Sequence, residues 1–201
     1  MLKIVTAPNP VLSQKAKKIN KIDKSILNLI EEMKKSLLLA RDPVGVGLAA
    51  PQVGKSLRIF LAKPTEESNF CIFINPEILK KSPEKGYVKR PASPPASPRG
   101  EQGGPKKDTS EKSSKQLEGC LSLPTIWGPV LRSSSLLLSF LDENGISHKK
   151  KFSGFMATII QHEIDHLDGI LFPKRVLEQK GILYKSRKDE KGEDVFEEIE
   201  I

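Results

Sequence analysis

The sequence predicts a single α+β domain in which antiparallel β-sheets surround a central helix. Three features indicate this class: an amphipathic helix near the N-terminus, strand-like runs joined by short turns, and a second helix apolar enough to lie inside the sheets. With 201 residues, the chain can bury one core of ordinary size and is too short for two. We therefore expect residues 1–201 to form one domain.

The first helix is predicted over residues 24–40, "KSILNLIEEMKKSLLLA". Ile26, Ile30, Met33 and Leu37 recur at helical spacing, so they share one face. We expect that face to pack on the core while the charged residues between them face solvent.

Strands are predicted where short apolar or alternating runs end at turn residues. The segments "LRIFLA" (57–62) and "FCIFINP" (70–76) are typical of strands. The segment "LLLSFLDENGISHKKKF" (136–152) is typical of a hairpin, with Asn144 and Gly145 as the two positive-φ residues of a tight turn. Near the C-terminus, "VFEEIEI" alternates and favours one more strand.

A second helix is predicted from Gly154 to about Gly169, where a glycine can end it. Its sequence, "FMATIIQHEIDHLDGILF", includes Ile159, Ile160 and Ile164 around polar residues. A helix with so many apolar positions is expected in the interior, and its polar side chains there need partners.

The net charge of +8 is concentrated in one segment. Residues 80–116 carry ten Lys/Arg and four Asp/Glu, which is +6, and the remaining 23 against 21 leave +2. Within this segment, residues 82–116 are rich in Pro, Gly, Ser and Lys and poor in apolar residues, which predicts a disordered basic insertion. Its single aromatic, Tyr87, gives no support for base stacking, so we expect no specific nucleic-acid partner.

The composition also indicates a compartment. No uncharged run approaches the roughly 20 apolar residues that cross a bilayer, and the N-terminus lacks the pattern of a secretion or transit leader. The two cysteines are too few to indicate a disulfide framework. We expect a cytoplasmic protein without membrane contact.

The stretch "QHEIDH" (161–166) places two of the three histidines on the second predicted helix. His162 and His166 are four residues apart, about 40° around the axis and roughly 6 Å along it, so both imidazoles can reach one ion. Glu163 adjoins them. This spacing on an interior helix indicates a divalent metal site rather than two incidental surface histidines.

A catalytic metal site needs a third protein ligand and one position open to water. His148 lies in the lysine-rich "SHKKKF", where a cation would meet like charge, and is expected to be a surface histidine. Cys71 alternates with apolar residues and is expected to be a small core residue. Cys120 lies in "EGCLSLP", whose glycine and proline mark an irregular backbone able to present a thiolate, and is the preferred candidate.

Three motifs in this order, "GVGLAAPQ" (45–52), "EGCLSLP" (118–124) and "QHEIDH" (161–166), closely resemble those of the peptide deformylase family. Its members are metallohydrolases that remove the N-formyl group from new polypeptides. The segment "PNPVLSQKAKKI" (8–19) is also similar to the family's N-terminal segment. The resemblance extends to about residue 175 and excludes the insertion and the tail at 176–201. It implies antiparallel sheets around a central metal-binding helix.

The resemblance implies a role for each matching position. The implied metal ligands are Cys120, His162 and His166. Glu163 corresponds to the general acid/base, and Gln52 with the backbone N–H of Leu121 to the donors that stabilise the oxyanion. Gly47 corresponds to a residue whose backbone contacts the peptide. Glu118 and Arg132 are similar to the carboxylate and arginine that brace the cysteine loop.

The implied cofactor is one divalent metal ion. Two neutral imidazoles and a thiolate leave such an ion a net charge of +1, enough to bring the pKa of a bound water toward neutrality. The resemblance implies Fe²⁺, and the donor set also accepts Zn²⁺, Ni²⁺ or Co²⁺. The implied substrates are N-formyl-methionyl nascent peptides, which also implies transient proximity to the ribosome.

A pocket for the methionine side chain is predicted beside the metal ligands. Phe155 and Ile159 lie one helical turn apart before His162, and Val46 is expected opposite them. Core packing is the alternative explanation for all three side chains.

Two features depart from the family pattern. Trp127 stands where many bacterial members carry an arginine near the peptide's path, which leaves open the preference beyond the first residue. The tail does not resemble the basic C-terminal helix through which some members dock on ribosomes.

Two other classes of protein remain as alternatives. A zincin-type metallopeptidase shares His162-Glu163-x-x-His166, but no histidine follows to complete its ligand set. A non-catalytic basic nucleic-acid-binding protein would need the charge on the folded body, and most of it lies in the insertion instead.

Overall fold

The computed structural model describes residues 2–40, 44–88, 117–188, 190 and 194–200 and confirms the predicted α+β class. In chain order, its helices and strands are η1 (Pro10–Ser13), α1 (Lys24–Leu39), β1 (Gly47–Ala49), η2 (Ala50–Val53), β2 (Ile59–Ala62), β3 (Cys71–Lys81), β4 (Lys85–Gly86), β5 (Glu118–Cys120), β6 (Leu123–Gly128), β7 (Arg132–Ser133), β8 (Ser135–Leu141), β9 (Ser147–Ser153), α2 (Gly154–Leu167), α3 (Phe172–Glu178), β10 (Tyr184–Lys188) and β11 (Asp194–Glu198). Within this part of the chain, no helix is long and apolar enough to cross a membrane.

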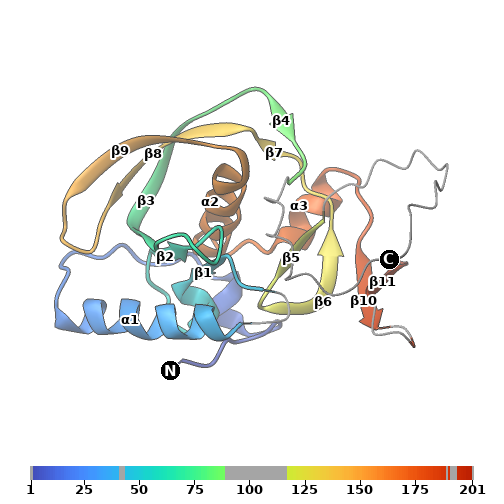
Figure 1. The fold of residues 1–201 in the computed structure, drawn as a ribbon, viewed down its shortest axis with the longest axis horizontal. Coiled ribbons are helices and arrows are strands. Elements are labelled where there is room, and N and C mark those ends of the chain that lie inside the picture. The colour runs from blue at the N-terminus through green and yellow to red at the C-terminus, as the bar shows by residue number, and fades with distance from the viewer. Residues whose placement is uncertain (1, 41–43, 89–116, 189, 191–193, 201) are drawn as a thin grey trace, which may run out of the picture.

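The strands form antiparallel sheets on either side of α2. A five-stranded sheet has the order β1-β2-β3-β8-β9, a four-stranded sheet the order β11-β10-β6-β5, and β4 pairs with β7. Figure 1 shows α2 enclosed by the curved long strands of the first sheet, with β5 and β6 across from it. The helix that carries QHEIDH therefore lies inside the molecule, as predicted.

The first sheet has two apolar faces because a helix covers each. Strand β2 sends Phe60 to the side where α2 packs, and Ile59 and Leu61 to the side where α1 packs. This explains why residues 57–62 are nearly all apolar rather than alternating with polar residues. The four residues of the predicted apolar stripe on α1 are all buried, and the carboxylate of Asp23 caps its first turn.

The β8–β9 hairpin exists, but its predicted turn is wrong. The connection is five residues long, and Gly145 has a positive φ of 78° whereas Asn144 does not. The carboxylate of Asp142 accepts hydrogen bonds from the backbone N–H groups of Asn144 and Ile146, both at 2.9 Å. An aspartate that closes the loop in this way removes the need for two left-handed residues.

The disordered insertion was predicted to begin at residue 82, but the structure describes the chain as far as residue 88. Residues 82–88 are ordered: Lys85 and Gly86 pair with β7, and the side chain of Val88 is only 3% exposed. The composition argument missed them because their partners, β7 and the pocket below, lie far away in the sequence. Residues 89–116 lie outside the described residues.

The predicted C-terminal strand is confirmed as β11. It pairs with β10, which pairs in turn with β6, so β10 and β11 extend the sheet that contains Cys120. Helix α2 ends at Leu167, two residues before Gly169, as expected.

Candidate active site

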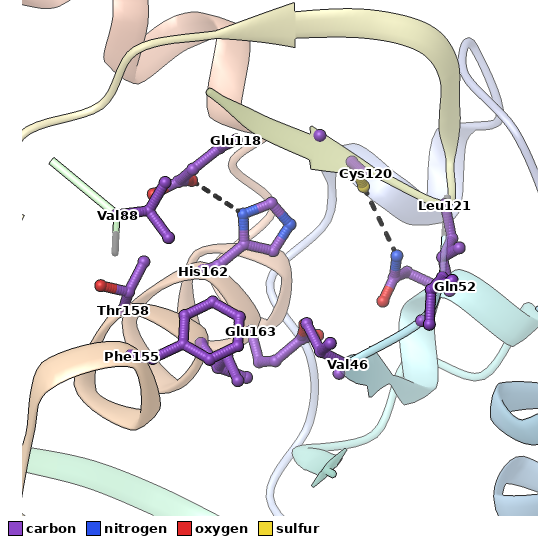
Figure 2. A pocket seen from close by; sticks show the side chains of 15 residues that line it. Val46, Gln52, Val88, Glu118, Cys120, Leu121, Phe155, Thr158, His162 and Glu163 are labelled. Carbon is purple, nitrogen blue, oxygen red and sulfur yellow. Dashed lines mark hydrogen bonds and ion pairs between the residues drawn. The ribbon is translucent and has the colours of Figure 1, made fainter. Parts of the chain in front are cut away.

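The three candidate ligands come together from two elements. His162 and His166 lie one turn apart on α2. Cys120 ends β5, and Figure 2 shows it across from His162. One ligand atom from each residue lies within 4.8 Å of the other two, and Cys120 Sγ is 3.2 Å from His166 Nε2. A thiolate with two imidazoles is a donor set that suits Zn²⁺ or Fe²⁺, so these residues fit the implied ion. Among the residues that the structure describes, no other such cluster occurs.

The electrostatics of the Cys120, His162 and His166 cluster favour the binding of a cation. Burial lowers the pKa of His162, but its hydrogen bonds to Cys120 and Glu118 outweigh this, and the net pKa is well above the usual value. Burial, with the charge of His162, holds the pKa of His166 well below the usual value, so that ring is neutral. A neutral imidazole beside a site that attracts positive charge is the form that binds a metal.

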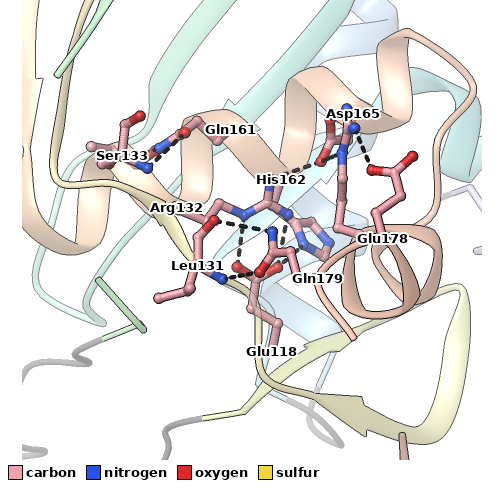
Figure 3. Close-up of polar contacts among 11 residues, drawn as sticks. Glu118, Leu131, Arg132, Ser133, Gln161, His162, Asp165, Glu178 and Gln179 are labelled. Atoms are coloured by element: carbon pink, nitrogen blue, oxygen red, sulfur yellow. Dashed lines mark hydrogen bonds and ion pairs between the residues drawn. The ribbon is translucent and has the colours of Figure 1, made fainter. Parts of the chain in front are cut away.

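His162 is oriented by a buried carboxylate. Glu118 accepts a hydrogen bond from Nδ1 of His162 at 3.0 Å, which leaves Nε2 for the ligand cluster. Arg132 donates to both oxygens of Glu118, from Nε at 2.7 Å and from Nη2 at 2.9 Å (Figure 3). Burial alone would raise the pKa of Glu118, but Arg132 outweighs it and lowers that pKa to about 2. The contacts that the resemblance implied for Glu118 and Arg132 are therefore present.

The network continues to residues that sequence reasoning missed. Arg132 Nη1 donates to Asp165 Oδ2 at 2.7 Å, and Arg175 Nη2 on α3 donates to Asp165 Oδ1 at 2.8 Å. Burial would raise the pKa of Asp165, but Arg175 and Arg132 together lower it. Asp165 is the second carboxylate of QHEIDH, so its place in that motif was the available signal.

Glu163 is the least satisfied group in the site. Its side chain is 4% exposed, and burial raises its pKa to about 7. Among described residues, its Oε2 is a buried side-chain oxygen without a hydrogen-bond partner. A Cβ on residue 47 would overlap Oε1 of Glu163, so any larger residue there would displace the Glu163 side chain. The carboxyl therefore lies directly against the backbone of β1.

Gln52 is held rigidly beside the cluster. Its Oε1 accepts a hydrogen bond from the backbone N–H of Ala49 at 2.8 Å, and its Nε2 lies 3.5 Å from Cys120 Sγ. The amide N–H₂ group therefore points toward the ligands, as Figure 2 shows. The backbone N–H of Ser122 also approaches the thiol, at 3.4 Å.

A pocket opens beside these groups. Its lining residues are Val44, Gly45, Val46, Gly47, Gln52, Val88, Glu118, Gly119, Cys120, Leu121, Phe155, Thr158, Ile159, His162 and Glu163. Val46, Phe155 and Ile159 thus line the same space as Cys120 and His162, whereas His166 is not among the lining residues. Sequence reasoning missed Val88, which faces Phe155 across the pocket in Figure 2, and Thr158, one turn before His162.

The two rejected ligand candidates lie elsewhere. His148 Nε2 is 2.7 Å from Asp142 Oδ2, and its ring stacks on Phe140 in the five-stranded sheet. Cys71 packs against the main core but is half-buried rather than fully buried, and burial raises its pKa. A raised pKa disfavours the thiolate, which is the form that binds metals.

Comparisons with known proteins agree with this geometry. A model of the family described as polypeptide deformylase matches residues 1–181. Peptide deformylase 2 of Prochlorococcus marinus is 38% identical over 181 residues, covering 89% of this chain and 75% of the relative. The peptide deformylase of Dictyoglomus turgidum is 36% identical over 171 residues, covering 85% and 90%. The match extends a few residues beyond the expected limit near residue 175.

A solved structure shows the same fold. The crystal structure of the peptide deformylase from Thermotoga maritima superposes with a TM-score of 0.68 at 31% sequence identity, covering 87% of this chain and 97% of the other. The fold and the site thus define a hydrolase with a buried Cys/His/His cluster. The chain belongs to the polypeptide deformylase family.

Proposed function

We propose that this chain removes the N-formyl group from the formyl-methionyl N-terminus of nascent polypeptides, with one divalent ion held by Cys120, His162 and His166. The observation that supports this most strongly is the three-ligand cluster beside Glu163, which lines the pocket and whose buried Oε2 has no hydrogen-bond partner among the described residues. When bound, such an ion would supply Lewis acidity and lower the pKa of water. Fe²⁺ is the proposed ion, with Zn²⁺, Ni²⁺ and Co²⁺ as substitutes.

Glu163 is proposed to move the proton. It takes a proton from the attacking water and delivers it to the amine nitrogen as the C–N bond breaks, so formate and a free N-terminus result. Its raised pKa of about 7 suits both directions of transfer near neutral pH. Because Gly47 has no side chain, the substrate backbone and the Glu163 carboxyl can lie close to β1.

Gln52 and Leu121 are proposed to bind the developing oxyanion. The carboxamide oxygen of Gln52 is occupied by Ala49 N–H, which aims its N–H₂ group at the site before substrate arrives. Leu121 follows the ligand Cys120 directly, so its backbone N–H lies on the same turn of chain. Donors fixed in advance stabilise charge that develops only in the transition state.

The pocket is proposed to hold the methionine side chain. Val46, Phe155 and Ile159 give it apolar walls within reach of the candidate ligands. Ile159→Asp should raise KM for formyl-methionyl peptides, because it places a charge in an apolar wall. Ile159→Val, which keeps the wall apolar, is the matched control and should retain a near-normal KM. Equal effects of the two substitutions on KM would contradict the pocket assignment.

The enzyme is proposed to act on nascent chains near the ribosome in the cytoplasm. The direct test is formate release from a formyl-Met-Ala-Ser peptide by protein purified without oxygen, with the acetylated peptide as substrate control. We expect formate release by the wild type and a loss of roughly 10²-fold in turnover for Glu163→Gln, at unchanged metal content. No formate release by metal-loaded wild type would contradict the proposed function.

A further inference from the structure

The C-terminal hairpin β10–β11 lies beyond the part of the chain that matches the family. The family match ends at residue 181, whereas the hairpin covers Tyr184–Lys188 and Asp194–Glu198. Even so, it joins the sheet that contains Cys120: Tyr184 pairs with Trp127 on β6, and Gly119 of β5 pairs with Trp127 from the other side. One residue of β6 thus connects the hairpin to the strand that ends at Cys120.

Trp127 supports the backbone next to that cysteine. A Cβ on Gly119 would lie 2.7 Å from one carbon of the Trp127 ring and 2.8 Å from another, so the Gly119 backbone rests directly on the indole. On the hairpin side, the ring of Phe196 meets Trp127 edge-on, with centroids 5.8 Å apart and an interplanar angle of 87°. The indole therefore lies between the hairpin and the residue that precedes Cys120, rather than in the lining of the pocket.

Ser186 of the hairpin forms hydrogen bonds with both the Trp127 indole and Thr125, whose backbone is strained. Its hydroxyl accepts a hydrogen bond from Trp127 Nε1 at 3.0 Å and donates to the carbonyl of Thr125 at 3.4 Å. Thr125 has a φ of 67°, a left-handed conformation that is unfavourable for a β-branched residue. Such strain persists only where the surroundings hold it, and here it lies in the short run that returns the chain from Cys120.

We propose that the β10–β11 hairpin positions Cys120 for metal binding through Ser186, Trp127 and Gly119. Trp127 and Ser186 are positioning residues in this account, since neither lines the pocket. Without them, β6 could relax at Thr125, the backbone of Gly119 would lose its support, and Sγ would move from the point that His162 and His166 share. The proposal rests on the metal site in the proposed function.

The test is titration of metal-free protein with Co²⁺, followed by the thiolate-to-cobalt absorption band. Residues that orient a metal ligand typically contribute 10- to 100-fold to affinity, so Trp127→Ala should raise Kd by about 10-fold or more. Ser186→Ala, which removes two hydrogen bonds and keeps the indole, should raise it by about 3-fold. Both variants should weaken the sulfur band at saturating Co²⁺. Arg187→Ala is the control, because Arg187 lies on the same hairpin and forms an exposed ion pair with Glu197.

A purely structural hairpin would behave differently. It would lower the thermal unfolding temperature of the variants while leaving Kd within twofold of wild type and the sulfur band unchanged, and that result would overturn the proposal. If Trp127→Ala does not fold, Trp127→Phe and Ser186→Ala decide by the same criterion. A wild type that binds no Co²⁺ at all would overturn the metal site and this proposal together, whereas a wild type that binds Co²⁺ normally and variants that match it would overturn this proposal alone.

Discussion

Helix α2 and strand β5 supply ligands to the same site by different means. His162 and His166 are one turn apart on a regular helix, so the helical backbone alone places both rings on one face. Cys120 ends a three-residue edge strand at a register shift. The two residues before it, Gly119 and Glu118, are held by Trp127 and Arg132 from other strands. Half of the site is therefore set by local geometry and half by tertiary contacts.

The buried polar groups of the site also differ in how they are satisfied, and Asp165 on α2 is bonded to two arginines. Glu118 on β5 is saturated by Arg132 and His162. The carboxylates that position the ligands thus have hydrogen-bond partners. The two side chains proposed to act on water or metal, Glu163 and His166 on α2, each keep one buried atom without a partner among the described residues.

The largest expected effect comes from removing a ligand from either element. Cys120→Ala and His162→Ala should each retain less than about a tenth of the wild-type metal and lose formate release, since three protein ligands are the minimum for a catalytic site. Cys71→Ala, which removes the other thiol, is the control and should keep both. Metal content by elemental analysis decides. A Cys120→Ala variant with full metal content would show that α2 alone holds the ion.

The second effect tests the saturated half of the site. Arg132→Leu leaves Glu118 and Asp165 buried without their shared partner, which should lower the free energy of unfolding by about 3–5 kcal/mol. Arg187→Leu breaks an ion pair whose side chains are more than half exposed, and should cost less than about 1 kcal/mol. Urea unfolding measures both. Similar losses of unfolding free energy in the two variants would show that burial of the Glu118 network does not increase its contribution to stability.

The third effect is the pH dependence of the unfolding free energy, which tests the burial of Glu163. Burial raises the pKa of Glu163 from 4.5 to about 7, so the folded, metal-free protein keeps a proton that the unfolded chain releases in that interval. The raised pKa contributes stability that is fully present below pH 4.5 and is lost as pH rises through about 7. The difference in unfolding free energy between wild type and Glu163→Gln should therefore fall by on the order of 3 kcal/mol across this window. A difference that does not change with pH would place Glu163 in contact with water instead.

The smallest effect concerns the segment that precedes β5 in the sequence. Replacing residues 90–114 with a short Gly/Ser link should change the unfolding free energy by no more than about 1 kcal/mol, because loop-closure entropy varies slowly with length. Replacing residues 83–114 removes Val88 and β4 as well, and should raise KM for formyl-methionyl peptides. Equal KM values for the two deletions would remove Val88 from the pocket wall.

The sequence predicted most of what depends on local periodicity. The histidine pair, the stripe on α1 and the final strand each follow from spacing within one element. Cys120 was preferred only from its irregular surroundings, and its bracing by Glu118 and Arg132 was implied by resemblance. Gln52 and Gly47 likewise entered through the resemblance.

Contacts between distant segments could not be predicted in the same way. Val88 is buried in a pocket whose wall includes α2, and α2 begins 66 residues later at Gly154. The low-complexity stretch that follows Val88 gives no sign of this contact. The partners of Asp165 and the packing of Trp127 against Gly119 likewise depend on strand pairing across the fold. The β8–β9 turn was missed because two backbone N–H groups donate to the carboxylate of Asp142, which closes the loop without a second left-handed residue.

The most direct test of the shared site is X-ray absorption spectroscopy of the zinc-loaded wild type. If α2 and β5 hold one ion together, the first shell contains one sulfur at about 2.3 Å and two imidazole nitrogens at roughly 2.0–2.1 Å, with an additional oxygen. Cys120→Ala should remove the sulfur contribution. A wild-type shell with nitrogen and oxygen alone would contradict the account, because the ion would then bind without β5.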